Sequence, residues 1–130
     1  MKSYFYGLAV SLLFISQGAS AYNYVSVAGI TLTDSNGSKV GHIGKGWSDY
    51  ANQAEESAMS ACGYEGCIVL QTNTGCIATA YDNARVVYAA SNPDVGSSQE
   101  YVMSYCYSQS TSGGCTNWDT VCADGYDSNP

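Results

Sequence analysis

The sequence has few of the side chains that most often carry catalysis. Histidine occurs once, as His42, and no G-x-S-x-G segment marks a serine as a nucleophile. The spacing C-x-x-C, which zinc sites usually combine with histidines, is also absent. We therefore expect no catalytic residue, no cofactor and no metal site, and a non-enzymatic role is the favoured interpretation.

Basic residues are scarce as well. Beyond Lys2 the chain has only Lys39, Lys45 and Arg85, against eleven acidic residues, which gives that part a net charge of −8. Nucleic acids and anionic membranes repel such a protein, so neither is expected as a partner. The charge favours solubility or attraction to a basic protein.

Long apolar runs are missing after the first residues. A positively charged start precedes an apolar run over residues 4–15, and Ala19-Ser20-Ala21 is the small-x-small pattern that signal peptidase accepts. The run is shorter than the about 20 residues that a membrane-spanning helix needs, which disfavours an uncleaved anchor. The pattern predicts a signal peptide over 1–21, followed by a secreted or periplasmic domain over 22–130 without membrane insertion.

The exported part does contain six cysteines, at positions 62, 67, 76, 106, 115 and 122. An even number in an oxidising compartment indicates three disulfides. Six cysteines admit 15 pairings, and their spacing alone does not choose among them.

The same order of elements is predicted twice. In the first half, strands over 24–32 and 39–43 flank the turn Asp34-Ser35-Asn36-Gly37, because Asn-Gly between β-patterned runs is typical of hairpins. A helix then begins near Ser48 or Asp49 and ends at Gly63, before a buried strand over 67–71.

The second half is expected to repeat this order with strands over 76–81 and 85–90. A helix ending at Cys106 follows, beginning either at Asn92-Pro93 or at a capping box from Ser97 to Glu100. The last strand is placed near residues 115–123, and residues 125–130 are expected to form a short flexible tail.

These elements predict an α+β fold of two pseudo-symmetric β-β-α-β units, over about 24–75 and 76–124, with both helices on one face of an antiparallel sheet. The cysteines follow the same repeat, with one at the end of each helix, one soon after it and one further on. Symmetry favours pairing each helix-end cysteine with the next one and joining the halves through the remaining two: Cys62–Cys67, Cys106–Cys115 and Cys76–Cys122.

A family resemblance rests on small residues and cysteines. The residues on which it rests are Gly46-Trp47-Ser48, then Ala54, Ala58 and Cys62, then Cys67-Ile68-Val69 and Cys76-Ile77-Ala78-Thr79-Ala80. In these residues the chain resembles the secreted bacterial family catalogued as domain of unknown function 4189, over nearly all of the mature part. Ser98 and Val102 depart from the family's preference for alanine. The resemblance implies an exported bacterial domain of this two-unit plan and transfers no catalytic residues.

Tyrosine and tryptophan are the remaining candidates for function, because they combine a large apolar area with a polar group. The candidate binding surface consists of five aromatic residues, Trp47, Tyr50, Tyr81, Tyr88 and Trp118. The leading hypothesis is a non-enzymatic module that binds, and in one version inhibits, another protein. The alternatives are an envelope-acting hydrolase that uses paired carboxylates, and a carbohydrate-binding module that uses Trp47 or Trp118.

Overall fold

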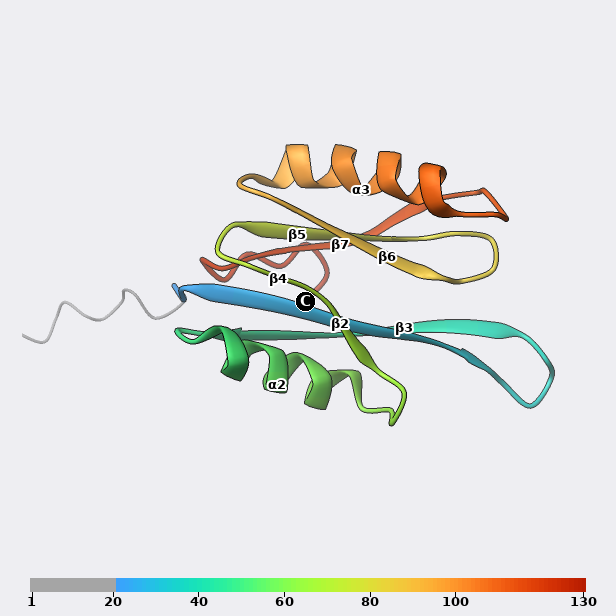
Figure 1. Cartoon of the computed structure of the whole chain (residues 1–130), viewed down its shortest axis with the longest axis horizontal. Helices are drawn as coiled ribbons and strands as arrows, with labels where there is room; N and C mark the ends of the chain where they lie inside the picture. Colours follow the sequence, from blue (N-terminus) through green and yellow to red (C-terminus); the bar gives the residue numbers. More distant parts are fainter. Residues whose placement is uncertain (1–20) are drawn as a thin grey trace, which may run out of the picture.

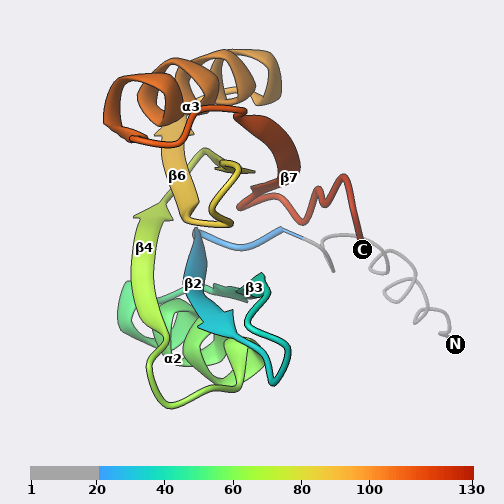
Figure 2. The same cartoon turned by 90° about the vertical axis from the view of Figure 1, so that its right-hand side faces the viewer.

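The chain is described by a computed structural model over residues 21–130, which form four layers (Figure 1). Helix α2, two three-stranded sheets and helix α3 follow one another, and Figure 2 shows the helices at opposite ends of the stack. The predicted signal peptide, residues 1–21, lies outside the described residues except for Ala21.

The first unit contains strands β2 (Tyr24–Thr33) and β3 (Lys39–Ser48), helix α2 (Ala51–Cys62) and strand β4 (Ile68–Asn73). Its antiparallel sheet has the order β3-β2-β4. The predicted Asn-Gly hairpin joins β2 to β3, and the Asp34 carboxylate stabilises the turn by accepting hydrogen bonds from two backbone N–H groups.

The second unit contains strands β5 (Cys76–Tyr81) and β6 (Val87–Asn92), helix α3 (Val95–Gln109) and strand β7 (Thr116–Cys122). Its sheet has the order β6-β5-β7. The central strand, the hairpin partner and the strand after the helix therefore occupy matching places in both units.

Helix α2 lies with its backbone directly on strand β3. A Cβ atom at Gly44 would be 2.1 Å from the backbone nitrogen of Cys62, and one at Gly46 would be 2.4 Å from the carbonyl oxygen of Ala54. Ala54 and Ala58 are fully buried on the facing side of the helix. Small residues on both surfaces thus permit this close approach.

The helix boundaries follow local capping chemistry. Gly63, with φ of +80°, ends α2 in the left-handed region as predicted, because glycine has no Cβ to clash there. Helix α3 begins at neither predicted position: Asp94 is its N-cap and accepts a hydrogen bond from the backbone N–H of Ser97. The helix also continues past Cys106 to Gln109.

The α+β class, the two units and the disulfide staples are confirmed, but the single shared sheet is wrong. The faces turned away from the helices pack against each other, through Val25 and Val27 of β2 and Ile77 and Val121 of the second unit. The opposite faces hold alanines under each helix, Ala28 beneath α2 and a cluster beneath α3. Because both faces of each central strand are buried, neither sheet has the open face that a single two-helix layer would leave.

The three disulfides are the pairs that symmetry favoured, Cys62–Cys67, Cys106–Cys115 and Cys76–Cys122. The first two close the end of each helix onto the following segment. The third does not join the halves, because Cys76 begins β5 and Cys122 ends β7 within the second unit. The contact between the units is therefore noncovalent.

Candidate binding groove at the junction of the two units

Two of the five candidate aromatic residues, Tyr81 and Trp118, lie together in a groove of about 280 Å³. Their rings meet edge to face, with centroids 5.6 Å apart. We call this the junction groove, because the first unit contributes the start of β3 and the second contributes β7 and the β5–β6 turn. Its lining residues are Lys39, Val40, Gly41, Tyr81, Arg85 and Trp118.

A β-bulge sets the position of Trp118. Thr79 pairs with Asp119 and Ala80 pairs with Asn117, so Trp118 is the extra residue on β7. The first unit has a bulge at the matching place, where Leu70 is the extra residue on β4. Leu70 packs on the core between the sheets, whereas the half-buried Trp118 lines the junction groove. Bulges are known to redirect side chains next to functional sites.

The turn that presents Arg85 is organised around a buried carboxylate. Asp82 is 2 % exposed, and its Oδ1 accepts hydrogen bonds from the backbone N–H groups of Ala84 and Val86. Its Oδ2 accepts from the hydroxyl groups of Ser110 and Tyr88. Burial opposes the charge, but these hydrogen bonds outweigh it and hold the pKa of Asp82 below its ordinary value.

Arg85 occupies a backbone conformation that costs energy. Its φ of +64° is the only positive φ of a non-glycine residue in the described part of the chain. Such a conformation costs about 1–2 kcal/mol for a residue with a Cβ. The Arg85 guanidinium lies 4.9 Å from the centre of the Tyr81 ring, a contact that contributes about 0.5–1 kcal/mol at an exposed site. The ring contact therefore positions the guanidinium without fully offsetting the strain.

Contacts from the first unit close the junction groove around this turn. The Thr31 hydroxyl donates a hydrogen bond of 2.6 Å to the backbone carbonyl of Arg85. A Cβ at Gly41 would lie 3.2 Å from that carbonyl oxygen and 3.5 Å from the Trp118 ring, so glycine at this position lets the two units approach closely.

The charges of the junction groove are opposite in sign to the net charge of the protein. Of the three basic residues after Lys2, Lys45 makes the ion pairs found within residues 21–130. Lys39 and Arg85 both line the junction groove, where the Lys39 ammonium donates only to the Thr33 hydroxyl. Within residues 21–130, the two cations that make no ion pair thus lie beside two aromatic rings.

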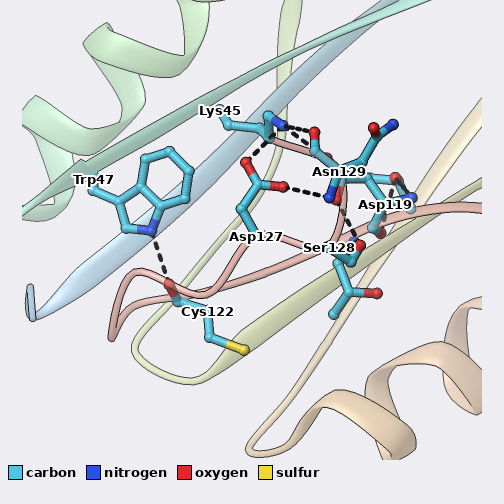
Figure 3. A network of polar contacts seen from close by, with 9 residues as sticks. Lys45, Trp47, Asp119, Cys122, Asp127, Ser128 and Asn129 are labelled. Atoms are coloured by element: carbon cyan, nitrogen blue, oxygen red, sulfur yellow. Dashed lines mark hydrogen bonds and ion pairs between the residues drawn. The ribbon is translucent and has the colours of Figure 1, made fainter. Parts of the chain in front are cut away.

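The other candidate aromatic residues lie elsewhere. Trp47 is half-buried against the core between the sheets, and its Nε1 donates to the carbonyl of Cys122 (Figure 3). Tyr88 donates to Asp82 and packs edge to face on Tyr105. Tyr50 is 63 % exposed in a separate shallow hollow beside the start of α2. Trp47 and Tyr88 therefore have structural contacts.

In the region that the structure describes, one pair of carboxylates shares a hydrogen-bond partner. That partner is the ammonium group of Lys45. The Lys45 ammonium lies 2.9 Å from Asp119 and 2.8 Å from Asp127 (Figure 3). Burial opposes the charge on Lys45, but its bonds to Asp127 and Asp119 outweigh burial and raise the pKa of Lys45. Burial also raises the pKa of Asp119, whereas the bond to Lys45 outweighs burial at Asp127 and lowers the pKa of that carboxyl.

This ion-pair cluster holds the C-terminal segment, for which the sequence predicted a flexible tail. Backbone hydrogen bonds join Cys122 to Tyr126 and Thr120 to Ser128, so the segment lies along the outer edge of β7. Lys45 also donates to the carbonyl of Asn129. The paired carboxylates therefore stabilise a chain end instead of facing a cleft.

Sequence reasoning named Tyr81 and Trp118 among its candidates but not Lys39 and Arg85, because it treated the charge of the chain as a whole. The sequence contained the signal: only three basic residues follow Lys2, against eleven acidic ones, so the position of each cation is informative. Within residues 21–130 no group of three metal-ligating side chains occurs, and no helix is long and apolar enough to cross a membrane.

A comparison with protein families matches residues 19–122 to the domain of unknown function DUF4189. The chain belongs to this family. No curated protein and no solved structure matches it. The DUF4189 match contains every residue that lines the junction groove and leaves out Asp127 and Asn129, which bind Lys45.

Proposed function

We propose that this DUF4189 domain is an exported, non-enzymatic module that binds another protein through the junction groove. One observation carries the proposal: the two cations that make no ion pair within residues 21–130 converge with two aromatic rings where both units meet. Tyrosine, tryptophan and arginine are the residues most enriched among those that dominate binding energy at interfaces.

The local backbone supports the same conclusion. Arg85 sits at a positive φ and Trp118 on a bulge, and strained or irregular positions concentrate at functional sites. A plain turn would favour glycine or asparagine at the position of Arg85, because these residues enter the left-handed region with little strain. A costly arginine there is explained by the use of its side chain.

Export is supported by the disulfide frame together with the predicted signal peptide. All six cysteines are paired, and such bonds persist in oxidising compartments. We propose a secreted or periplasmic location on this basis.

Site-specific photocrosslinking tests the function. The exported protein carries p-benzoylphenylalanine in place of Val40, which lines the junction groove and is 37 % exposed, and the control carries it in place of Tyr101, which is exposed on α3. Both are incubated with envelope fractions and culture fluid of the producing cell. We expect an adduct with a defined protein from the groove position and none of that adduct from α3.

The affinity of the purified partner is then measured with Trp118→Leu. Leucine suits the bulge, since Leu70 occupies the matching place in the first unit, so folding should persist. We expect at least a tenfold loss of affinity, and no loss for Tyr101→Ala. Equal affinity of Trp118→Leu and the unchanged protein would reject the junction groove as the binding site.

Carbohydrate binding through Trp118 is tested with the same variant. A glycan array on which the unchanged protein binds and Trp118→Leu does not would replace the protein-binding proposal with this one.

A further inference from the structure

The cations of the junction groove have no ion-pair partner in the described part of the chain, although the protein has ample carboxylates. Eleven acidic residues are available, yet no carboxylate lies within ion-pair distance of Lys39 or Arg85 among the residues for which coordinates are described. Lys45 shows the contrasting case, in which two carboxylates surround one ammonium. The charges of Lys39 and Arg85 are therefore free to meet a group from outside the chain.

The geometry of Arg85 fits a carboxylate. The Cζ atom of Arg85 lies over the Tyr81 ring, 4.9 Å from its centre, and a guanidinium carries its N–H donors around the edge of its plane. That edge forms two parallel hydrogen bonds with a carboxylate, which is planar and of matching width. Lys39 at the start of β3 supplies a second positive charge to the same hollow.

The remaining walls are apolar or aromatic. Val40, Tyr81 and Trp118 contribute them, and the volume of about 280 Å³ holds a side chain or two of a short segment. A ligand that fills the junction groove thus needs an apolar or aromatic side chain next to its carboxylate.

We propose that the junction groove recognises an acidic segment of a partner protein, in which an Asp or Glu lies beside an apolar or aromatic residue. This inference rests on the proposed protein-binding function and specifies its ligand. It is opposite to the basic partner that the net charge alone favours. Charges further away than about 8 Å are largely screened at physiological ionic strength, so the local cations decide the contact.

A peptide-display selection tests the inference. The oxidised exported protein is the bait for a library of random peptides, with Arg85→Asn as the counter-selected variant. Asparagine tolerates the left-handed backbone, so this change removes the guanidinium while the turn is retained. We expect enriched peptides to carry Asp or Glu adjacent to an aromatic or apolar residue.

One enriched peptide is then synthesised together with its amide version, in which Asp and Glu become Asn and Gln. We expect its affinity to fall at least tenfold with the amide peptide, with Arg85→Asn and with Trp118→Leu, and to stay the same with Tyr101→Ala. Thermal unfolding of each variant checks that the fold persists.

The outcomes separate the two proposals. Enriched peptides that require Trp118 but carry no carboxylate would overturn the acidic ligand and leave the binding function standing. A selection that yields no peptide dependent on Trp118 would overturn the acidic ligand, and the crosslinking experiment with the natural partner would still decide the binding function.

Discussion

Replacing Asp82 with asparagine tests whether a buried carboxylate organises the turn beside the junction groove. Asp82 accepts four hydrogen bonds, from the backbone N–H groups of Ala84 at 2.9 Å and Val86 at 3.0 Å, and from the hydroxyl groups of Ser110 and Tyr88 at 2.6 and 3.2 Å. Asparagine preserves the shape and one acceptor oxygen. It presents an amide group where two hydroxyl donors now point.

The expected cost at neutral pH is about 2 kcal/mol. A hydrogen bond to a charged group contributes about 1.5–3 kcal/mol and one between neutral groups about 0.5–1.5, so each bond loses about 1 kcal/mol and the four together lose about 4 kcal/mol. Asparagine avoids part of the penalty for burying a charge, which offsets about half of that loss. Urea unfolding with intact disulfides, followed by tryptophan fluorescence, measures the difference.

The difference between Asp82 and its asparagine variant should depend on pH in one direction. The pKa of Asp82 is lowered in the folded protein, because hydrogen bonds from Ser110, Val86 and Tyr88 outweigh the effect of burial. Its stabilising contribution is therefore complete above the ordinary pKa of 3.8 and decreases as the pH falls through the lower pKa of the folded state. The variant should approach the unchanged protein in stability under strongly acid conditions.

Asp94→Asn is the matched control, since Asp94 is exposed at the N-cap of α3 and asparagine caps a helix equally well. We expect it to leave the free energy of unfolding almost unchanged. An equally small effect of Asp82→Asn at neutral pH, or a large effect undiminished in acid, would refute the assignment of Asp82.

Three further changes test the frame. Gly44→Ala should lower the free energy of unfolding in urea by about 3 kcal/mol or more, because its Cβ would meet the α2 backbone at 2.1 Å. The control Gly37→Ala has open space around it and a φ of +83°, so it should cost only about 1 kcal/mol. Replacing both Cys76 and Cys122 with serine opens a loop of 46 residues and should lower the free energy of unfolding by about 4 kcal/mol. Lys45→Met leaves two carboxylates facing each other, and we expect faster amide exchange in the C-terminal segment and a loss of about 2 kcal/mol; unchanged exchange would contradict this.

Local chemistry allowed much of the fold to be predicted. The Asn36-Gly37 hairpin, the Gly63 helix end and the span of β5 each depend on residues close in sequence, and the structure has them as expected. The number of sheets depends instead on which faces meet. In β5, five successive residues are buried, so no alternation indicates which face covers a helix and which covers another sheet.

The junction groove could be predicted only in part for a related reason. Aromatic content singled out Tyr81 and Trp118. The bulge that places Trp118 depends on how β7 pairs with β5, a strand about 40 residues earlier in the chain, and such a register is set by the whole sheet. Trp47 was a candidate for the same reason, its aromatic side chain. It packs against the core instead, and its indole N–H donates to the carbonyl of Cys122.

The two units have a β-bulge at the matching place, and the extra residue has a different role in each unit. In the first unit the extra residue is Leu70, which completes the core between the sheets, and in the second it is Trp118, which lies against Gly41 of the other unit at the rim of that contact. The groove therefore exists only while the two units remain in register, although no disulfide joins them. Binding at the groove should stabilise the contact between the units, because the ligand favours the docked arrangement that forms its site.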